Sequence, residues 1–311
     1  MKTLSYHLRN YLALRRQLGF KCYVEGSFLH SFLRFAREQK ARFVSAKLAL
    51  QWSMLPANIT QKHRAQRLGV VRGFAQYLKL FDRRTEVPSP KMLPARTCRP
   101  SPFLYTEKQV DHLICSAHQI EPRYKIKGLT LGTLLGLLAT TGMRVGEVLA
   151  LDGDDVDFAG ALLTIRSAKG NKSRLVPLHP STVQALQRYA RARDKIYPRS
   201  AAPSFFVWLG GRRLRYQVAW EWFRVAACDA GLRALGGGRG GPRIHDLRHY
   251  FAVRTLLNWY RGDDDVDVRL PELATFLGHA HVSDTYWYIS AVPELLALAT
   301  HRWERAEKGR K

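Results

Sequence analysis

The sequence predicts a mainly helical protein of two domains, the second of which contains a small antiparallel β-sheet. Three observations lead to this prediction. Apolar residues recur at helical spacing through most of the chain. Two short runs, residues 162–165 and 174–178, have the composition of strands. A proline-rich segment divides the chain, whose 311 residues suffice for two hydrophobic cores.

Residues 1–87 are expected to form the first, all-helical domain. Apolar side chains recur there every three or four positions, at Leu4, Leu8, Leu12, Phe28, Phe32, Phe35, Leu68, Val71, Phe74 and Leu78. Gly19 and Gly26 are expected to bracket a break between helices, and Pro56 to mark another.

The charge of the chain indicates a polyanionic partner. Lys and Arg number 50 against 25 acidic residues, which gives a net charge of +25, far beyond what solubility requires. Residues 1–100 hold 20 basic and 4 acidic residues, so the first domain is expected to provide the main electrostatic grip. The candidates for phosphate contacts are Arg15, Arg16, Lys62, Arg64 and Arg67. Each alone is better explained as a solvated surface charge, and only the net charge of +16 over residues 1–100 argues for nucleic acid.

Membrane and metal-binding proteins fit the sequence poorly. The N-terminus lacks the apolar region of a signal peptide, and the most apolar stretch, residues 129–143, is too short to span a bilayer. The cysteines, Cys22, Cys98, Cys115 and Cys228, lie far apart with no CxxC pair, so neither a zinc site nor a disulfide framework is expected. We expect a cytoplasmic protein that does not bind membranes.

Residues 88–102 are expected to form a basic linker, because five prolines fall within them and cannot continue a helix. The second domain, residues 103–311, begins with a helix capped by Thr106. A buried helix at 129–140 ends before Gly142, and further helices are expected at 181–193, 216–230, 245–260 and 293–307. Between the two strands, the segment SAKGNKS at 167–173 contains a Gly-Asn turn signal, which predicts a β-hairpin with a basic tip.

Four local patterns of the second domain carry chemistry and occur in a fixed order. They are TGMRVGE at 141–147, the hairpin with Lys169, HDLRH at 245–249, and LGH at 277–279 followed nine residues later by Tyr288. The ordered set resembles the tyrosine recombinase, or phage integrase, family over residues 103–300. The helical first domain resembles that family's core-binding domain. The resemblance implies site-specific cleavage and rejoining of DNA through a covalent 3′-phosphotyrosine, with no metal or other cofactor.

Arg144 and Arg248 are the expected clamp on the scissile phosphate. Cleavage of a phosphodiester passes through a state with extra negative charge on the non-bridging oxygens, and guanidinium groups donate paired hydrogen bonds to such oxygens. Arg144 follows a buried helix and a glycine turn, a place where a charged residue is uncommon unless it has a partner or a function. Glu147, one helical turn further on, is expected to orient it.

Histidines and lysines complete the expected set. His245 and His279 occupy the family's histidine positions and are expected to donate to the phosphate or transfer protons, and His249 to play a supporting role. Lys169 resembles the family's lysine that protonates the leaving 5′ oxygen. Lys172 and Arg174 are then expected to contact the DNA backbone, although a solvated hairpin tip explains Lys172 equally well.

Tyr286 and Tyr288 are both candidates for the nucleophile, which must be a hydroxyl that survives as a phosphoester. The family places its tyrosine nine residues after the histidine of the LGH pattern, which favours Tyr288.

Two other patterns do not predict a binding site for a metal or a nucleotide. The acidic residues 263–267 lack calcium-loop spacing, and the glycine run at 236–241 lacks the ending of a P-loop.

Several alternatives remain open at this level. A type IB topoisomerase would use a similar residue set, and a catalytically silent accessory DNA-binding protein would retain the fold. A generic RNA-binding protein would explain the charge but not the ordered set. The resemblance implies a double-stranded DNA partner with specific recombination sites and a homotetramer on two such sites, with or without partner recombinases. Residues 286–288 and 292–296 look most like integrases of bacterial mobile elements.

Overall fold

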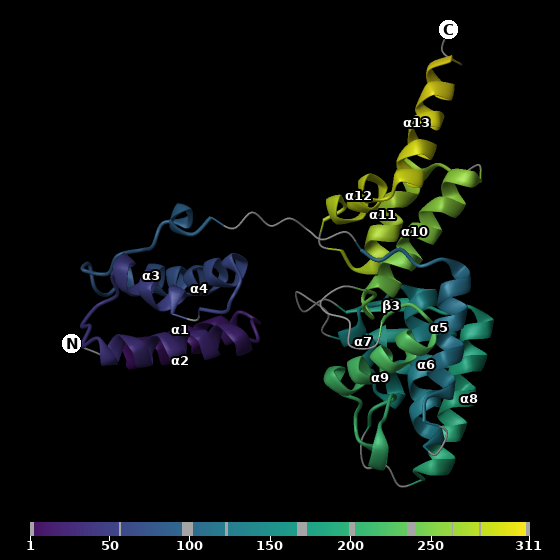
Figure 1. Cartoon of the computed structure of the whole chain (residues 1–311), viewed down its shortest axis with the longest axis horizontal. Helices are drawn as coiled ribbons and strands as arrows, with labels where there is room; N and C mark the ends of the chain where they lie inside the picture. The colour runs from purple at the N-terminus through teal and green to yellow at the C-terminus, as the bar shows by residue number, and fades with distance from the viewer. Residues whose placement is uncertain are drawn as a thin grey trace. The chain divides into compact units, whose positions relative to one another are not determined.

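The computed structural model describes residues 3–55, 57–94, 102–121, 124–166, 173–198, 203–234, 241–262, 264–279 and 281–308, without the side chains of 290, 291 and 305–308. The chain divides into two compact units, Met1–Pro100 and Ser101–Lys311 (Figure 1). Each unit has a hydrophobic core of its own. Within the described residues, no helix combines the length and apolar character needed to cross a membrane.

The first unit is helical, as the apolar spacing predicts. Its helices are α1 (Leu4–Gln17), α2 (Tyr23–Glu38), α3 (Ala46–Met54) and α4 (Gln61–Lys79), followed by the short 3-10 helix η1 (Pro90–Met92). Hydroxyl side chains at Thr3, Ser45 and Thr60 accept hydrogen bonds from the first turns of α1, α3 and α4 and thereby fix where these helices begin.

The core of the first unit uses most of the predicted apolar positions. Leu8, Leu12, Phe32, Leu68, Val71, Phe74 and Leu78 are buried, whereas Leu4, Phe28 and Phe35 are half-buried around them. The prediction that Gly26 bounds a helix break is wrong, because Gly26 lies inside α2 and is buried. A Cβ atom there would lie 3.8 Å from Leu12, so the glycine lies at the contact between α1 and α2. The predicted break at Pro56 falls outside the described residues.

The second unit combines helices with a three-stranded sheet. Its elements in order are α5 (Glu107–Gln119), α6 (Lys125–Thr141), α7 (Val145–Ala150), η2 (Gly153–Asp155), β1 (Val156–Asp157), β2 (Leu162–Ile165), β3 (Arg174–Pro177), α8 (Pro180–Ile196), η3 (Leu209–Gly211), α9 (Tyr216–Asp229), α10 (Asp246–Arg261), α11 (Val266–Leu277), α12 (Ser283–Ala291) and α13 (Pro293–Lys308). The strands are antiparallel in the order β1-β2-β3, and Leu163 of β2 pairs with Val156 and Val176. The sheet therefore has one strand more than the predicted hairpin.

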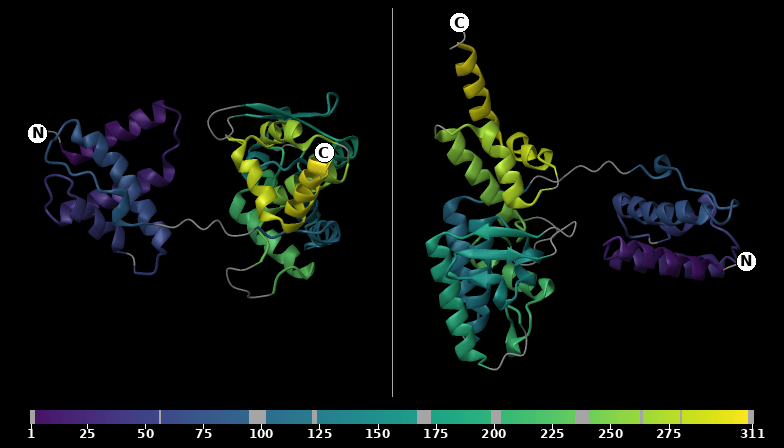
Figure 2. Two further views of the ribbon diagram at one scale, coloured as in Figure 1. Left: turned by 90° about the horizontal axis from the view of Figure 1, so that it is seen from above. Right: turned by 180° about the vertical axis from the view of Figure 1, so that it is seen from behind.

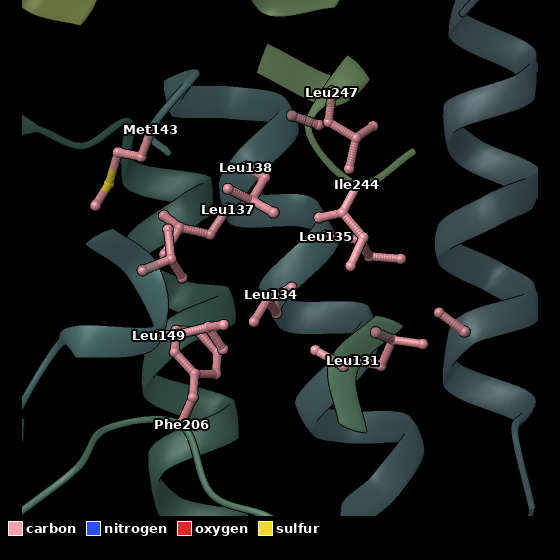
Figure 3. Close-up of a cluster of buried hydrophobic side chains, with 14 of the residues drawn as sticks. Leu131, Leu134, Leu135, Leu137, Leu138, Met143, Leu149, Phe206, Ile244 and Leu247 are labelled. Atoms are coloured by element: carbon pink, nitrogen blue, oxygen red, sulfur yellow. The ribbon is translucent and has the colours of Figure 1, made fainter. Parts of the chain in front are cut away.

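Helix α6 is the centre of the larger core of this unit. It is apolar on all sides, as expected for a helix surrounded by other elements. It contacts α5, α8, α9 and α10. Its leucines meet Met143, Leu149, Phe206, Ile244 and Leu247 from surrounding segments (Figure 3). The segments on either side of Arg144 and the start of α10 are thus anchored in the same core.

A smaller core joins α10, α11, α12 and α13. It includes Leu256, Leu270, Leu277, Tyr288 and Leu295, all nearly inaccessible to solvent. Helix α13 begins beside α10 and α12 and then projects away from the rest of the unit (Figure 2). The guanidinium of Arg302 in α13 donates hydrogen bonds to four backbone carbonyls around the end of α10, those of Trp259, Tyr260, Gly262 and Asp264. Two of these carbonyls lie in the last turn of α10 and two follow it, and the hydrogen bonds of Arg302 hold α13 against this helix end.

Candidate active site

Arg144 is held at the turn between α6 and α7. Gly142 ends α6 in the left-handed conformation with φ 59°. A Cβ atom there would lie 2.4 Å from the Phe251 ring, so only glycine fits. The Arg144 backbone N–H then donates to Oε2 of Glu147 at 3.0 Å. This fixes the side chain of Arg144, which is 26% exposed, at the start of α7.

Glu147 connects two arginines. Its Oε1 accepts hydrogen bonds from Arg144 Nη1 at 2.8 Å and from Arg174 Nη1 at 3.1 Å, and its Oε2 accepts one from Arg174 Nη2 at 2.8 Å. Burial raises the pKa of this carboxyl, but the hydrogen bonds and charges of Arg174 and Arg144 outweigh burial and lower the pKa of Glu147 to about 2. Glu147 therefore stays ionised and orients Arg144, as its spacing predicts.

Arg248 lies in the first turn of α10 and is only 3% exposed. Its Nη1 donates to the carbonyl of Gly142 at 2.9 Å. Among the described residues, the buried Nη2 has no hydrogen-bond partner. Burial, and then the positive charge of Arg144, lower the pKa of Arg248 to about 10, so the group remains charged at neutral pH. A buried cationic donor without an acceptor indicates a site for an anion.

A hydrogen bond to the carbonyl of Gly278 connects the LGH segment with Arg144. Gly278 ends α11 in the left-handed conformation with φ 69°, and its carbonyl accepts a hydrogen bond from Arg144 Nη2 at 2.7 Å. His279 follows directly, and its Nδ1 lies 2.7 Å from Oγ1 of Thr285, a fully buried residue of α12. Sequence reasoning missed Thr285, because nothing in the pattern distinguishes this threonine from a core residue.

Tyr288 lies among the histidines and is 1% exposed. Its ring centroid is 5.4 Å from that of His249 and 6.2 Å from that of His279. Its phenol also raises the pKa of Arg248, against the larger lowering by burial. Tyr286, by contrast, is 51% exposed. The structure thus places Tyr288 with the other predicted residues and Tyr286 on the surface.

His245 is the N-cap residue of α10, just outside the buried group. The residue is exposed, but its ring packs edge-on against His249 at 5.1 Å. Partial desolvation of the ring, and then the positive charge of Arg248, lower the pKa of His245. The neutral ring is therefore available to donate to an anion at neutral pH. The other two predicted members of this set, Lys169 and Lys172, lie outside the described residues.

Two arginines predicted to contact DNA point into the protein. Arg174 is 14% exposed and is bonded to Glu147. Arg67 of α4 is 9% exposed, stacks on the Trp52 ring at 3.7 Å and donates to the carbonyl of Trp52, so this placement does not support a phosphate contact. The remaining candidates lie at the end of α1, at Arg15 and Arg16, and in the first turn of α4, at Lys62 and Arg64.

Acidic residues do not form a metal site in the described part of the chain. No group of three or more His, Cys, Asp or Glu side chains there could hold an ion. Asp264 instead pairs with Arg269 at 2.9 Å, and Asp265 caps α11. These contacts account for both residues as structural groups.

Comparison with known proteins identifies the family. The model of the phage integrase family matches residues 104–294. The chain belongs to the phage integrase family. Its relatives include the integrase/recombinase homologue y4rB of Sinorhizobium fredii, 39% identical over 309 residues and covering 98% of each chain. The tyrosine recombinase XerC of Herpetosiphon aurantiacus is 34% identical over 226 residues, which cover 72% of this chain and 67% of XerC.

A solved structure agrees with the fold of this integrase-family chain. The Tn1549 transposon integrase in complex with transposon right end DNA superimposes with a TM-score of 0.64, over 96% of this chain and 98% of that one, at 15% identity. The described part of this chain is mostly helical with a small three-stranded antiparallel sheet. The predicted fold class is therefore confirmed.

Proposed function

We propose that this integrase-family chain is a site-specific DNA recombinase that cleaves and rejoins strands through a covalent 3′-phosphotyrosine. The observation that carries the proposal is the buried Nη2 of Arg248, which has no acceptor among the residues that the structure describes and whose pKa responds to the nearby Arg144 and Tyr288. A phosphate that enters this site would supply the missing acceptor. The same group of residues contains a hydroxyl nucleophile.

The proposed chemistry is a transesterification. The Tyr288 hydroxyl gives its proton to one of the site histidines as its oxygen attacks the phosphorus, the bond from phosphorus to the 5′ oxygen breaks, and the leaving oxygen takes a proton to become a free hydroxyl. Arg144 and Arg248 stabilise the added charge on the non-bridging oxygens. His245 and His279 donate hydrogen bonds or transfer protons, and Lys169 is the proposed acid for the leaving group. Rejoining reverses these steps with the 5′ hydroxyl of another strand, so no nucleotide cofactor is consumed.

Cleavage requires movement of α12. Tyr288 is 1% exposed, and its neighbours His249, Trp287 and His279 surround the ring. Tyr288 and the Nη2 of Arg248 are both buried, so a DNA phosphate needs a rearrangement of the site to reach either group. We therefore propose that binding of the target site shifts α12 and brings Tyr288 towards the two arginines.

The two units have separate proposed roles. Residues 1–87 are the core-binding domain, with Arg15, Arg16, Lys62 and Arg64 as phosphate contacts, 88–102 the linker, and 103–311 the catalytic domain with its C-terminal tail. The uneven distribution of charge supports this division. Four protomers are proposed to assemble on two double-stranded sites in the cytoplasm, with or without partner recombinases.

A bacterial mobile element is the proposed context. The relative that covers 98% of this chain is named as an integrase/recombinase. One structural neighbour over 96% of this chain is a transposon integrase, and XerA recombinase has the same coverage. The integrase names support the proposed mobile-element context, and the Xer names support the recombinase activity shared by both.

The test uses DNA that flanks the native gene, with a nick that lets the cleaved end diffuse away. Denaturing gels then show whether protein becomes covalently linked to DNA without added metal. We expect an adduct with the wild type and with Tyr286→Phe, and none with Tyr288→Phe. Specific binding without any adduct, with or without partner recombinases, would instead indicate an accessory DNA-binding protein. Relaxation of supercoiled DNA by the monomer without site preference would indicate a topoisomerase.

A further inference from the structure

Arg174 joins three segments of the site. It is the first residue of β3 and pairs with Ile165 of β2. Its Nε donates to the carbonyl of Phe276 at 3.1 Å, while Nη1 and Nη2 donate to the two carboxylate oxygens of Glu147 at 3.1 and 2.8 Å. All three guanidinium nitrogens therefore have protein acceptors. An arginine that contacts a DNA phosphate would turn these donors outward.

The carboxylate of Glu147 transmits the position of Arg174 to Arg144. Oε1 accepts from the side chains of both arginines, and Oε2 accepts from Arg174 and from the backbone N–H of Arg144. The planar fork of Arg174 matches the two oxygens and fixes the plane of the carboxylate. A lysine at 174 would keep the charge but present a single donor group, and Glu147 would be free to rotate.

The same two arginines hold the end of α11. The carbonyls of Phe276 and Gly278 lie where the helix ends, and Arg174 and Arg144 donate to them respectively. The packing is tight: a Cβ atom on Gly278 would lie 2.9 Å from Arg174 Nη1 and 3.4 Å from Arg144 Nη1. His279 follows this packed turn directly, so its position also depends on Arg174.

We infer that Arg174 is a positioning residue for strand cleavage, acting on Arg144 through Glu147, and not a contact to the DNA backbone. This inference rests on the proposed function. The other arginine at the base of the hairpin, Arg166, offers a comparison, because its side chain is 64% exposed and pairs with Asp155 instead of Glu147. Arg166 therefore serves as the matched control.

The experiment compares Arg174→Lys with Arg166→Lys in the full chain. Cleavage of the nicked target is measured under single-turnover conditions, alongside DNA affinity at several salt concentrations. We expect Arg174→Lys to slow cleavage by about tenfold or more, the range found when groups that orient active-site residues are lost. Its DNA affinity and salt slope should equal those of the wild type. Arg166→Lys should match the wild type in every measurement.

A second substrate separates positioning from a general structural defect. In this substrate a methylphosphonate replaces the scissile phosphate, which removes the negative charge that Arg144 stabilises. We expect the rate ratio of wild type to Arg174→Lys to shrink on this neutral linkage. A variant that is merely less well folded would lose the same factor on both substrates. Arg174→Met provides a second variant if the lysine variant is unstable by thermal unfolding.

The outcomes distinguish this inference from the proposed function. A salt slope reduced by about one in Arg174→Met, which removes the charge, would indicate a direct phosphate contact and overturn the inference. An unchanged cleavage rate, or an equal loss on both substrates, would also overturn it while leaving the proposed function intact. If the wild type binds its target and forms no adduct, the proposed function fails and the inference fails with it.

Discussion

Arg248 donates a hydrogen bond of 2.9 Å from Nη1 to the carbonyl of Gly142, 106 positions earlier in the chain. This bond joins the first turn of α10 to the turn that precedes Arg144. Both partners are buried, so the bond is shielded from water and from competing donors. The two arginines of the site therefore keep a fixed spacing before any phosphate is present.

Replacement of Arg248 is expected to stop catalysis without releasing DNA. Arg248→Lys should reduce the rate of adduct formation by about a hundredfold or more, because a preorganised donor to the transition state is lost. Affinity for the target should change little, since binding is spread over many phosphates. Arg254→Lys on the same helix is the control, because its side chain is 53% exposed and pairs with Glu107. Equal losses in the two variants would contradict the assignment.

Glu147 is expected to make stability depend on acidity. Its pKa of about 2 in the folded chain lies below the value of about 4.3 for an unfolded glutamate, so its ionised form stabilises the fold at neutral pH. This contribution disappears as the pH falls from about 4.3 through 2. Glu147→Gln should lower the free energy of unfolding by about 2–3 kcal/mol at pH 7, and by less at each step below pH 5.

Denaturant titrations of the wild type and Glu147→Gln between pH 7 and pH 3 measure this difference. Glu272→Gln replaces an exposed carboxyl of α11 and should leave the unfolding free energy unchanged at pH 7. A difference between the wild type and Glu147→Gln that stays constant down to pH 3 would show that the carboxylate charge contributes nothing.

The free protein is expected to hide its nucleophile from reagents. Tetranitromethane should nitrate Tyr286, which is 51% exposed, and spare Tyr288, which is 1% exposed. Peptide mass spectrometry after partial reaction measures both sites in one sample, so each tyrosine is the control for the other. Similar extents of nitration would mean that α12 already leaves the core without DNA.

Four basic residues of the first unit, two of them half-buried, are expected to set the salt dependence of DNA binding. The test variant replaces Arg15, Arg16, Lys62 and Arg64 with glutamine. If each makes one phosphate contact, the slope of log affinity against log salt should fall by about 3–4. The control replaces four exposed basic residues elsewhere in the same unit, Lys40, Arg42, Lys47 and Arg83. Equal slopes for both variants would assign the effect to net charge alone.

Helix α13 is expected to loosen when Arg302 is removed. Arg302→Ala leaves four carbonyls around the end of α10 without this donor. Hydrogen exchange should accelerate in residues 293–304 and at the end of α10, because α13 then keeps the core contact of Leu295 and the Arg261–Glu294 ion pair but loses its hydrogen bonds to these carbonyls. His301→Ala, an exposed neighbour on the same helix, should leave exchange unchanged. Unchanged exchange in Arg302→Ala would assign the docking to apolar contacts.

Local chemistry made much of this fold predictable. The strand at 162–165 and the helix start at Tyr216 depend on short-range patterns and agree with β2 and α9. The N-cap at Thr106 was also correct and forms a capping box with Gln109. The order of the family motifs predicted that the two arginines and Tyr288 lie together. The distances between these residues along the sequence do not predict this by themselves.

The remaining features could not be predicted from the sequence, because they depend on contacts between residues far apart in the chain. Nothing near Arg174 in the sequence shows that its acceptors are Glu147, 27 positions before it, and Phe276, 102 positions after it. The burial of Arg67 depends on Trp52 from another helix in the same way. The short strand β1 is only two residues long, and its pattern cannot be told from that of a turn.

Under the proposed function, the burial of Tyr288 would keep nonspecific DNA binding apart from strand cleavage. A chain with 50 basic residues is expected to bind any duplex through its charge, and nearly all cellular DNA lies outside specific sites. Under the proposed function, a phenol held inside the core would leave such encounters without an exposed group that breaks a strand. The chain would then scan a genome without nicking it, and cleavage would depend on the few contacts that hold one short helix in place.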